Sequence, residues 1–289
     1  MYKKNKKIII FGGSGFLASH VADKLILNGY DVIIFDNKKS KYMSKGQKFF
    51  QGDILKLKNV LKVTKNAYAV YHFAGVSDID TANQFPYKTL NINIFGTINI
   101  LEACVKNKIK QIIFASSIYA LSEQGGFYST SKLTSEMIIE RYSKKFKFNF
   151  NILRFGSLYG PRFNYFNSIG KYINQAKKIG KIIRFSNGNE KRNYINVLDA
   201  ADICIAVLKS KFKNKYYNLL GKKKYKVRNV LNLIAKEMKV KKIIYNNKNS
   251  EYHYNTNPYT YKLRKGTLLY PKKEINLSLG IRNVIKELK

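Results

Sequence analysis

The chain has 289 residues, enough to bury the core of one large α/β domain or of a nucleotide-binding domain with a smaller partner. Its two cysteines, Cys104 and Cys204, lie in apolar helical patterns, which excludes a disulfide scaffold and suits a reducing cytoplasm. No stretch approaches the roughly 20 apolar residues of a membrane span, so we expect a cytoplasmic protein without one.

The formal charge of +37 does not by itself predict a nucleic-acid partner. The lysines are spread along the whole chain and accompany abundant Ile, Asn and Tyr, a joint bias that an AT-rich genome produces without selection for binding a polyanion. We therefore expect no nucleic-acid partner. A general positive potential would still attract a small anionic substrate.

The first elements are predicted to be a strand, a turn and a helix. Ile8–Phe11 is an apolar run, as expected for a central strand of a parallel sheet that helices cover on both faces. Gly12 and Gly15, with Ala18 three residues further on, form a turn in which close approach to a pyrophosphate excludes large side chains. The amides that open the next helix, predicted at Ser19–Asn28, would then face the phosphates of a dinucleotide.

An acidic residue ends the second predicted strand. Gly29 closes the first helix, the apolar run Val32–Phe35 follows, and Asp36 comes 21 residues after Gly15. At that place a carboxylate accepts hydrogen bonds from both hydroxyls of an adenosine ribose and repels the 2′-phosphate of NADP. The spacing therefore predicts a dinucleotide site that prefers NAD.

Two further strands end in residues suited to a bound nucleotide. The short strand Lys48–Ile54 carries Asp53, which could contact adenine, cap a helix predicted at Leu55–Val63, or do both. Ala69–Phe73 is the fourth predicted strand. The small residues Ala74-Gly75 that follow it would let the backbone pass against a cofactor.

The alternation of strand and helix continues to about residue 160. Helix Tyr87–Lys106, strand Gln111–Ala115, helix Tyr128–Lys145 and strand Asn149–Arg154 follow one another. Such alternation predicts an α/β fold with a doubly wound parallel sheet (Rossmann) and right-handed crossovers. Ligands of these sheets bind at the carboxyl ends of the strands.

The rest of the chain is less regular and predicts a smaller C-terminal substrate-binding domain. We expect the Rossmann domain at 1–160, with a return segment near 190–210, and mainly the substrate-binding domain at 161–289. The polar, aromatic tail Tyr252–Tyr259 either lines a substrate pocket or only packs, and the sequence favours neither. The predicted elements of this part are helix Phe166–Gly180, a strand near Ile182, helix Leu198–Lys209 and helix Val227–Met238.

Tyr128 and Lys132 are candidate catalytic residues because they lie four apart on a helix and project from one face. An ammonium near a phenol lowers its pKa, so the tyrosine can take a proton from an alcohol while a hydride leaves the same carbon for a nicotinamide. Ser117, at the end of the neighbouring strand, would hold that hydroxyl. His72 lies inside a strand without a carboxylate or cysteine partner in sequence, and we interpret it as a packed histidine.

With these residues in place, the chain resembles the extended short-chain dehydrogenase/reductase family, in particular its NAD-dependent nucleotide-sugar epimerases and dehydratases. Gly12–Leu17, Ile33–Asn37 and His72–Gly75 look most like motifs of the UDP-glucose 4-epimerases, and the resemblance covers nearly the whole chain. It implies NAD as the cofactor, a nucleotide-sugar substrate, and a homodimer that pairs the helices Tyr87–Lys106 and Tyr128–Lys145 across a two-fold axis.

The resemblance also implies which residues form the site. Ser117, Tyr128 and Lys132 would be catalytic, and no metal is expected. Substrate would be contacted by Ser77, Ser117, Ser157, Arg162 and Arg192. NAD would be contacted by Gly12, Gly15, Phe16, Leu17, Asp36, Asn37, Asp53, Ile54, Phe73, Ala74, Gly75, Ser77, Asn93, Tyr128, Lys132 and Gly156.

Three departures from the family's pattern refine this reading. Ala18 replaces the third glycine, Ser157 replaces an asparagine that lies against the sugar diphosphate, and Ile118-Tyr119 replaces the Asp-Glu pair of dehydratases and the glutamate of decarboxylases. Without those carboxylates, water elimination and decarboxylation lose the groups they need. We therefore predict a nucleotide-sugar epimerase that acts at C4 through a 4-keto intermediate, with Tyr128 as base. The alternatives are an NAD(P)H-dependent reductase of a 4-keto nucleotide sugar and, less favoured, a non-catalytic dinucleotide-binding protein.

Overall fold

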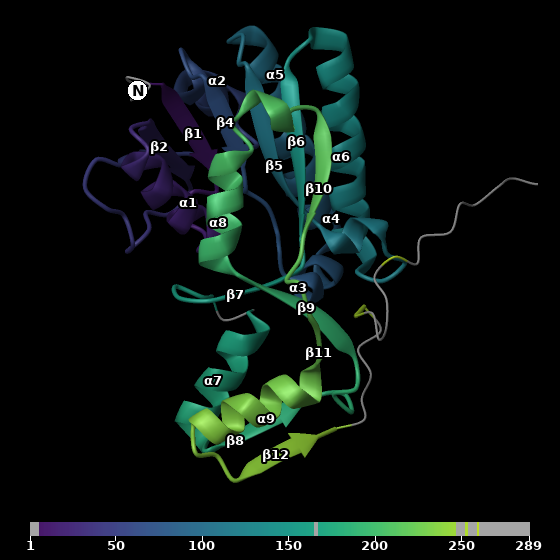
Figure 1. Ribbon diagram of the computed structural model, residues 1–289. Helices are drawn as coiled ribbons and strands as arrows, with labels where there is room; N and C mark the ends of the chain where they lie inside the picture. Colours follow the sequence, from purple (N-terminus) through teal and green to yellow (C-terminus); the bar gives the residue numbers. More distant parts are fainter. Residues whose placement is uncertain (1–5, 165–166, 247–251, 254–258, 260–289) are drawn as a thin grey trace, which may run out of the picture.

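The computed structural model describes residues 6–164, 167–246, 252, 253 and 259, and is built around one parallel sheet (Figure 1). Within these residues, seven strands lie in the order β10-β6-β5-β4-β1-β2-β3, and each neighbouring pair is parallel. The predicted doubly wound α/β fold is therefore confirmed. The strands of this sheet are β1 (Lys7–Phe11), β2 (Asp31–Asp36), β3 (Lys48–Gln51), β4 (Ala69–His72), β5 (Gln111–Ser117), β6 (Asn149–Phe155) and β10 (Lys215–Leu219).

Helices connect the strands and cover both faces of the sheet (Figure 1). The predicted helix Tyr87–Lys106 runs through α4, a π-helical segment at Asn91–Phe95, and α5. Short 3-10 helices lie at Ile118–Leu121 and Ser210–Phe212. The α-helices are α1 (Phe16–Leu27), α2 (Leu57–Thr64), α3 (Ile79–Gln84), α4 (Pro86–Leu90), α5 (Gly96–Lys106), α6 (Gly126–Phe146), α7 (Ser168–Ile179), α8 (Val197–Ala206) and α9 (Val227–Glu237).

Alternate residues of β1 show how the sheet buries both faces. Ile8 and Ile10 belong to a core that includes α1 and α8, whereas Ile9 and Phe11 belong to a second core that includes α2, α5 and α6. All four side chains have an exposed fraction of 0%. A strand covered on both faces must be apolar at every position, which is why β1 reads as a continuous apolar run.

The starts of α1 and α2 differ from the sequence-based prediction. α1 begins three residues earlier than expected, directly after Gly15. α2 begins at Leu57 with Lys56 at its N-cap, so Asp53 does not cap it. The Asp53 carboxylate instead accepts a hydrogen bond from the amide of Leu55 at 2.9 Å, within the turn that precedes the helix.

A smaller domain lies beyond one end of the large sheet (Figure 1). It contains the sheet β11-β9-β7 and the parallel pair β12-β8, packed with α7 and α9. Its core includes Tyr172, Ile182 and Leu231. The strands of this domain are β7 (Ser157–Tyr159), β8 (Lys181–Arg184), β9 (Lys191–Asn196), β11 (Lys224–Lys226) and β12 (Lys242–Tyr245).

The chain returns to the large sheet between the elements of the smaller domain. α8 packs against α1, and β10 pairs with β6 as an edge strand. The segment that returns to the large sheet therefore reaches Leu219, whereas the sequence analysis expected it near 190–210. β9 lies within 190–210 but belongs to the sheet of the smaller domain. Among the described helices, none is long and apolar enough to cross a membrane.

Candidate active site

A cavity of about 870 Å³ opens at the carboxyl ends of β1, β2, β4 and β5. Its size suits an extended cofactor. Of the residues expected to contact NAD, Asn93 alone is missing from the lining. The others all line it: Gly12, Gly15, Phe16, Leu17, Asp36, Asn37, Asp53, Ile54, Phe73, Ala74, Gly75, Ser77, Tyr128, Lys132 and Gly156.

The glycine turn after β1 shapes the inner wall of this cavity. Gly12 has a φ of +74°, the left-handed conformation that glycine favours, and a Cβ there would lie 2.5 Å from the amide nitrogen of Ala74. α1 begins directly after Gly15, and among the described residues no side chain caps its amides. The positive end of the α1 dipole therefore faces the cavity, as a pyrophosphate site requires.

Asp36, at the end of β2, places a carboxylate in the same cavity. One of its oxygens accepts from the amide of Ser14 at 3.1 Å, and the other from the amide of Lys38 at 3.3 Å. Each carboxylate oxygen has a further lone pair. The carboxylate is thus held by the backbone while it can still accept the hydroxyls of a ribose.

Asn93 fixes the turn after β4 instead of facing the cavity. Its amide group donates to the Val76 carbonyl at 3.1 Å and to the Ser131 hydroxyl at 2.9 Å, and its oxygen accepts from the Val76 amide at 2.7 Å. A Cβ on Gly75 would come within 2.6 Å of that oxygen. Both N–H groups of Asn93 are therefore used inside the protein, where they position the wall that carries Ala74 and Gly75.

Ser117, Tyr128 and Lys132 come together at the inner end of the cavity. Ser117 ends β5, Tyr128 lies in the first turn of α6, and both side chains line the cavity. The Lys132 ammonium lies 5.9 Å from the centre of the Tyr128 ring and donates to the Ala115 carbonyl at 2.8 Å. The sequence spacing thus corresponds to one cluster of side chains.

The protonation of this cluster differs from the expectation that Lys132 lowers the pKa of Tyr128. Burial raises the pKa of Tyr128 above its usual value, and the nearby Ser117 hydroxyl opposes that rise. Burial lowers the pKa of Lys132 to about 8, and the nearby Glu136 carboxylate opposes that fall. Because the ammonium contacts Ala115, Ser117 is the partner that favours the phenolate in this structure.

A buried ion pair lies one turn beyond Lys132 on α6. Glu136 is 1% exposed and pairs with Arg154 of β6, whose terminal nitrogen lies 2.6 Å from the carboxylate and whose Nε also donates to it. The Ser116 hydroxyl donates to the same carboxylate at 2.5 Å. These bonds tie β5, β6 and α6 together directly behind the candidate catalytic residues.

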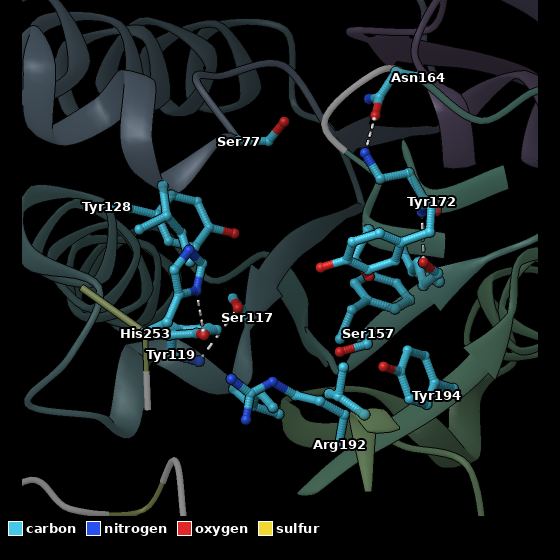
Figure 2. Close-up of a pocket in the computed structure, with 18 of the residues that line it drawn as sticks. Ser77, Ser117, Tyr119, Tyr128, Ser157, Asn164, Tyr172, Arg192, Tyr194 and His253 are labelled. Carbon is cyan, nitrogen blue, oxygen red and sulfur yellow. Dashed lines mark hydrogen bonds between the residues drawn. The ribbon is translucent and has the colours of Figure 1, made fainter. Parts of the chain in front are cut away.

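A second cavity of about 280 Å³ continues from the first toward the smaller domain, and Figure 2 shows the side chains that line it. Both cavities are lined by Ser77, Ser117 and Tyr128. Ser157 and Arg192 line the second cavity but not the first. Tyr128 therefore lies at the junction of the two, where a cofactor and a substrate would meet.

Arg162, expected beside the substrate, lies elsewhere. Its guanidinium is 2.7 Å from the Asp23 carboxylate of α1 and 5.1 Å from the centre of the Tyr42 ring. It is not among the described residues that line either cavity. Arg162 instead ties the loop after β7 to α1.

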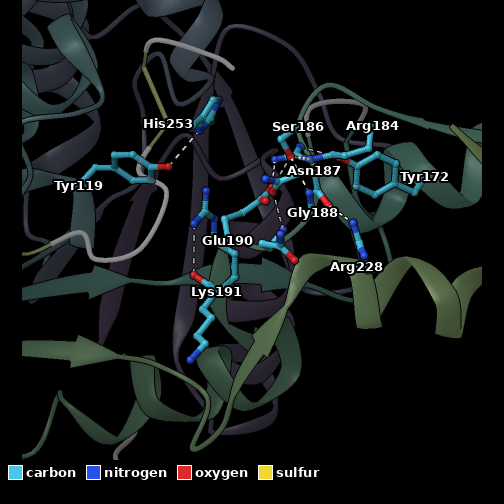
Figure 3. Close-up of polar contacts among 12 residues, drawn as sticks. Tyr119, Tyr172, Arg184, Ser186, Asn187, Gly188, Glu190, Lys191, Arg228 and His253 are labelled. Atoms are coloured by element: carbon cyan, nitrogen blue, oxygen red, sulfur yellow. Dashed lines mark hydrogen bonds and ion pairs between the residues drawn. The ribbon is translucent and has the colours of Figure 1, made fainter. Parts of the chain in front are cut away.

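The end of the second cavity within the smaller domain contains side chains that the sequence did not single out. Tyr172, Arg184 and Tyr194 line it, and Arg184 donates to the Tyr172 hydroxyl at 2.7 Å and pairs with Glu190 (Figure 3). These residues come from α7, β8 and β9 and from the loop before β9. No sequence spacing links them, because only the fold brings them together.

His253, in the tail whose role the sequence left open, also lines the second cavity. Its Nδ1 lies 3.0 Å from the Tyr119 hydroxyl (Figures 2 and 3). Of the tail, Tyr252, His253 and Tyr259 are described, and positions 254–258 lie outside the described residues. One described side chain of the tail therefore faces the substrate side of the site.

His72 is packed in the core, as the sequence indicated. It is 1% exposed, its Nε2 lies 2.8 Å from the Thr97 hydroxyl, and burial lowers its pKa to about 3. It is therefore neutral at physiological pH. Among the described residues, no group of three or more His, Cys, Asp or Glu is placed to hold a metal ion.

The chain is similar to known proteins along nearly its whole length. Residues 8–219 match the NAD dependent epimerase/dehydratase family. A putative UDP-glucose 4-epimerase of Methanocaldococcus jannaschii is 30% identical over 305 residues, which cover 98% of each chain. The dTDP-D-glucose 4,6-dehydratase of Homo sapiens is 25% identical over 74% of this chain and 69% of its own length.

Solved structures share the fold. The UDP-glucose 4-epimerase of Thermotoga maritima, solved with UDP-glucose, has a TM-score of 0.79 at 22% identity and covers 98% of this chain and 100% of its own. The UDP-glucuronic acid 4-epimerase of Bacillus cereus, solved with UDP-glucuronic acid and NAD, has a TM-score of 0.79 at 22% identity and covers 86% and 88%.

A parallel dinucleotide-binding sheet with serine, tyrosine and lysine at its carboxyl edge defines a short-chain dehydrogenase/reductase. Within that class, the chain belongs to the NAD-dependent epimerase/dehydratase family. NAD is accordingly its cofactor, and the open amides of α1 and the carboxylate of Asp36 fit the pyrophosphate and the ribose of such a group.

Proposed function

We propose that the protein is a nucleotide-sugar 4-epimerase that works through a 4-keto intermediate, with Tyr128 as the base. The observation that carries this proposal is the position of Ser117 and Tyr128, which line both the large cavity and the smaller one. A phenol at that junction can reach a substrate hydroxyl whose carbon also faces the cofactor. The M. jannaschii and B. cereus relatives are named as 4-epimerases of UDP-sugars, which favours a UDP-sugar here.

In the proposed reaction, Ser117 holds the C4 hydroxyl of the sugar and Tyr128 takes its proton. Bound NAD supplies the hydride acceptor for the same carbon. With a pKa of about 8, Lys132 is positively charged at neutral pH, while Ser117 is the group that favours the phenolate of Tyr128 in this structure. After the 4-keto sugar turns, Tyr128 returns the proton to the oxygen, and hydride returns to the other face of C4.

The lining of the smaller cavity supports epimerisation over the water elimination and decarboxylation that other nucleotide-sugar enzymes carry out. Arg192 lines this cavity with a guanidinium suited to a nucleotide diphosphate, while the charge of Arg184 is paired with Glu190. Among the described residues that line this cavity, none is an aspartate or a glutamate. The part of this cavity that the described residues line therefore offers no acidic side chain for water elimination or decarboxylation, whereas epimerisation needs only the serine, the tyrosine and the lysine.

The test is turnover of UDP-glucose to UDP-galactose by the purified holoenzyme, followed by chromatography without added NADH. Tyr128→Phe keeps the ring but removes the proton acceptor, so turnover should fall by about 10² to 10⁴ while UDP-glucose binding barely changes. Ser117→Ala should cost less, because it removes one hydrogen bond to the reacting hydroxyl. Lys132→Met should reduce both turnover and NAD binding.

Two outcomes would contradict the proposal. Near-parent turnover by Tyr128→Phe would show that another group takes the proton. A parent protein that reduces a 4-keto nucleotide sugar with one NADH consumed per product, and forms no epimer, would identify the reductase instead.

We also infer a homodimer that forms through the helices of the 86–106 and 126–146 segments. Tyr87, Phe95 and Met137 lie on these segments and are 85%, 60% and 56% exposed. Large apolar side chains so exposed on neighbouring helices are suited to burial against a second copy. A cytoplasmic location stays a prediction.

A further inference from the structure

A hydrogen-bonded pair that the proposed reaction does not use lies beside the catalytic residues. Tyr119 comes two residues after Ser117, and its ring meets the Tyr128 ring edge to face with centroids 6.4 Å apart. Its hydroxyl lies 3.0 Å from Nδ1 of His253, and both side chains line the smaller cavity (Figure 2). Tyr119 therefore stands next to the two residues that would hold the reacting hydroxyl.

The backbone also holds His253 in this position. The Tyr252 carbonyl accepts a hydrogen bond from the Gly125 amide at 2.9 Å, and Gly125 is the N-cap of α6. The rings of His253 and Tyr119 meet edge to face at 6.1 Å. Residues 252 and 253 are thus joined to the two segments that carry Ser117 and Tyr128.

The surroundings of His253 favour one direction of the hydrogen bond with Tyr119. Burial lowers the pKa of His253, so the ring is neutral at pH 7. Nε2 lies 3.8 Å from the Asp80 carboxylate, which favours the proton on that nitrogen and leaves Nδ1 to accept from Tyr119. The Tyr119 oxygen can then accept a hydrogen bond from a ligand. Among the described residues, the charged groups that act on the ring are Asp78, Asp80, Arg184 and Arg192.

We propose that Tyr119 is a further substrate-binding residue, whose oxygen accepts a hydrogen bond from a hexose hydroxyl next to the reacting one. His253 acts through Tyr119 as a positioning residue, because its Nδ1 fixes where the phenolic hydrogen points. The ligand class is a hexose with a free hydroxyl beside C4. This inference rests on the proposed function, since it takes the ligand of the smaller cavity to be a nucleotide sugar.

The test compares the binding of UDP-glucose and of UDP to the NAD-loaded protein by titration calorimetry. Tyr119→Phe keeps the ring packing and should weaken UDP-glucose binding by about 3- to 10-fold while leaving UDP binding unchanged. Tyr194→Phe is the matched control, since Tyr194 lines the cavity within the smaller domain and should not affect UDP-glucose selectively.

Three results would overturn the contact: no change in Tyr119→Phe, an equal change for both ligands, or a parent that binds UDP-glucose no more tightly than UDP. All three are binding results. They are independent of whether UDP-galactose forms, so a failure of the contact is distinguishable from a failure of the epimerase proposal.

The role of His253 is tested separately by a double-mutant cycle and a pH profile. His253→Leu should weaken UDP-glucose binding in the parent but add nothing in Tyr119→Phe, because it acts through that hydroxyl. Since the pKa of His253 lies below 6.5, UDP-glucose affinity should be constant above pH 6.5 and fall below it, as the protonated ring donates to Tyr119. The profile of His253→Asn should lack this fall. Additive losses, or matching profiles in the parent and His253→Asn, would overturn the positioning role.

Discussion

Loss of the Arg154 guanidinium should destabilise the protein far more than loss of a similar arginine nearer the surface. Arg154→Met removes the partner of Glu136, and the two side chains are 14% and 2% exposed. Arg162→Met removes the partner of Asp23, and those side chains are 25% and 23% exposed. The two ion pairs have nearly equal distances, 2.6 and 2.7 Å, but the Arg154 pair is more buried and is joined by further hydrogen bonds from Arg154 Nε and the Ser116 hydroxyl.

The expected magnitudes follow from that difference. Removing one partner of a buried ion pair leaves an uncompensated charge and costs about 3 to 5 kcal/mol, whereas a more exposed pair contributes about 0 to 1 kcal/mol. A chain of 289 residues has an unfolding entropy of about 0.6 kcal/mol per degree. The Tm should therefore fall by about 5 to 8 °C in Arg154→Met and by less than about 2 °C in Arg162→Met.

Differential scanning calorimetry of both variants measures this difference, at one protein concentration and with saturating NAD, because a bound cofactor shifts Tm. The double variant Arg154→Met, Glu136→Leu should recover part of the loss, since it removes the unpaired charge as well. Equal falls in Tm for the two single variants would refute the argument that burial determines the cost.

Three further predictions follow from the charges and the exposed surface. The apo protein should bind NAD more tightly than NADP because Asp36 repels a 2′-phosphate, and Asp36→Asn should narrow the gap; equal affinities of the parent in a titration would contradict this. The pKa of Lys132 is lowered from 10.5 to about 8, so between these pH values the unfolded chain keeps a proton on Lys132 that the folded protein has lost. The free energy of unfolding, measured with denaturant, should therefore rise as the pH increases from about 8 to 10.5. Lys132→Met should lack this contribution. The double variant Tyr87→Lys, Phe95→Lys should be a monomer in light scattering. A parent protein that is already monomeric at micromolar concentration would argue against the dimer.

The central sheet could be predicted because each of its inner strands is buried on both faces and reads as an apolar run. β10 was not predicted, because it is not buried on both faces. It is an edge strand whose residues Lys215 to Asn218 are exposed or half-buried, so its sequence carries no strong apolar signal. Its pairing with β6 depends on the path that the chain takes through α8, which local sequence does not encode.

The cofactor side of the site was predictable from local motifs, while much of the substrate side was not. The glycine turn, Asp36 and the Tyr128–Lys132 spacing each depend on a few neighbouring residues at the end of one strand or on one helix. Tyr172, Arg184 and His253 are brought together by separate elements of the less regular part of the chain.

Two residues that the resemblance places beside ligands make polar contacts within the protein in this structure. The Asn93 amide donates hydrogen bonds to Val76 and Ser131, and the Arg162 guanidinium pairs with Asp23. An amide or a guanidinium satisfies its hydrogen bonds with whatever lies within reach. Which partner it finds depends on the loop or helix that packs against it, and that packing is a property of the whole fold.

Burial acts in opposite directions on the two titrating catalytic residues, and this links the ion pair behind the site to its chemistry. It raises the pKa of Tyr128 and lowers that of Lys132, so both shifts oppose the phenolate–ammonium state that proton transfer needs. Ser117 counters the first shift and Glu136 the second. Because Arg154 neutralises part of the Glu136 charge, its removal should raise the pKa of Lys132 and move the alkaline limit of the proposed epimerase activity to higher pH, even as it lowers stability.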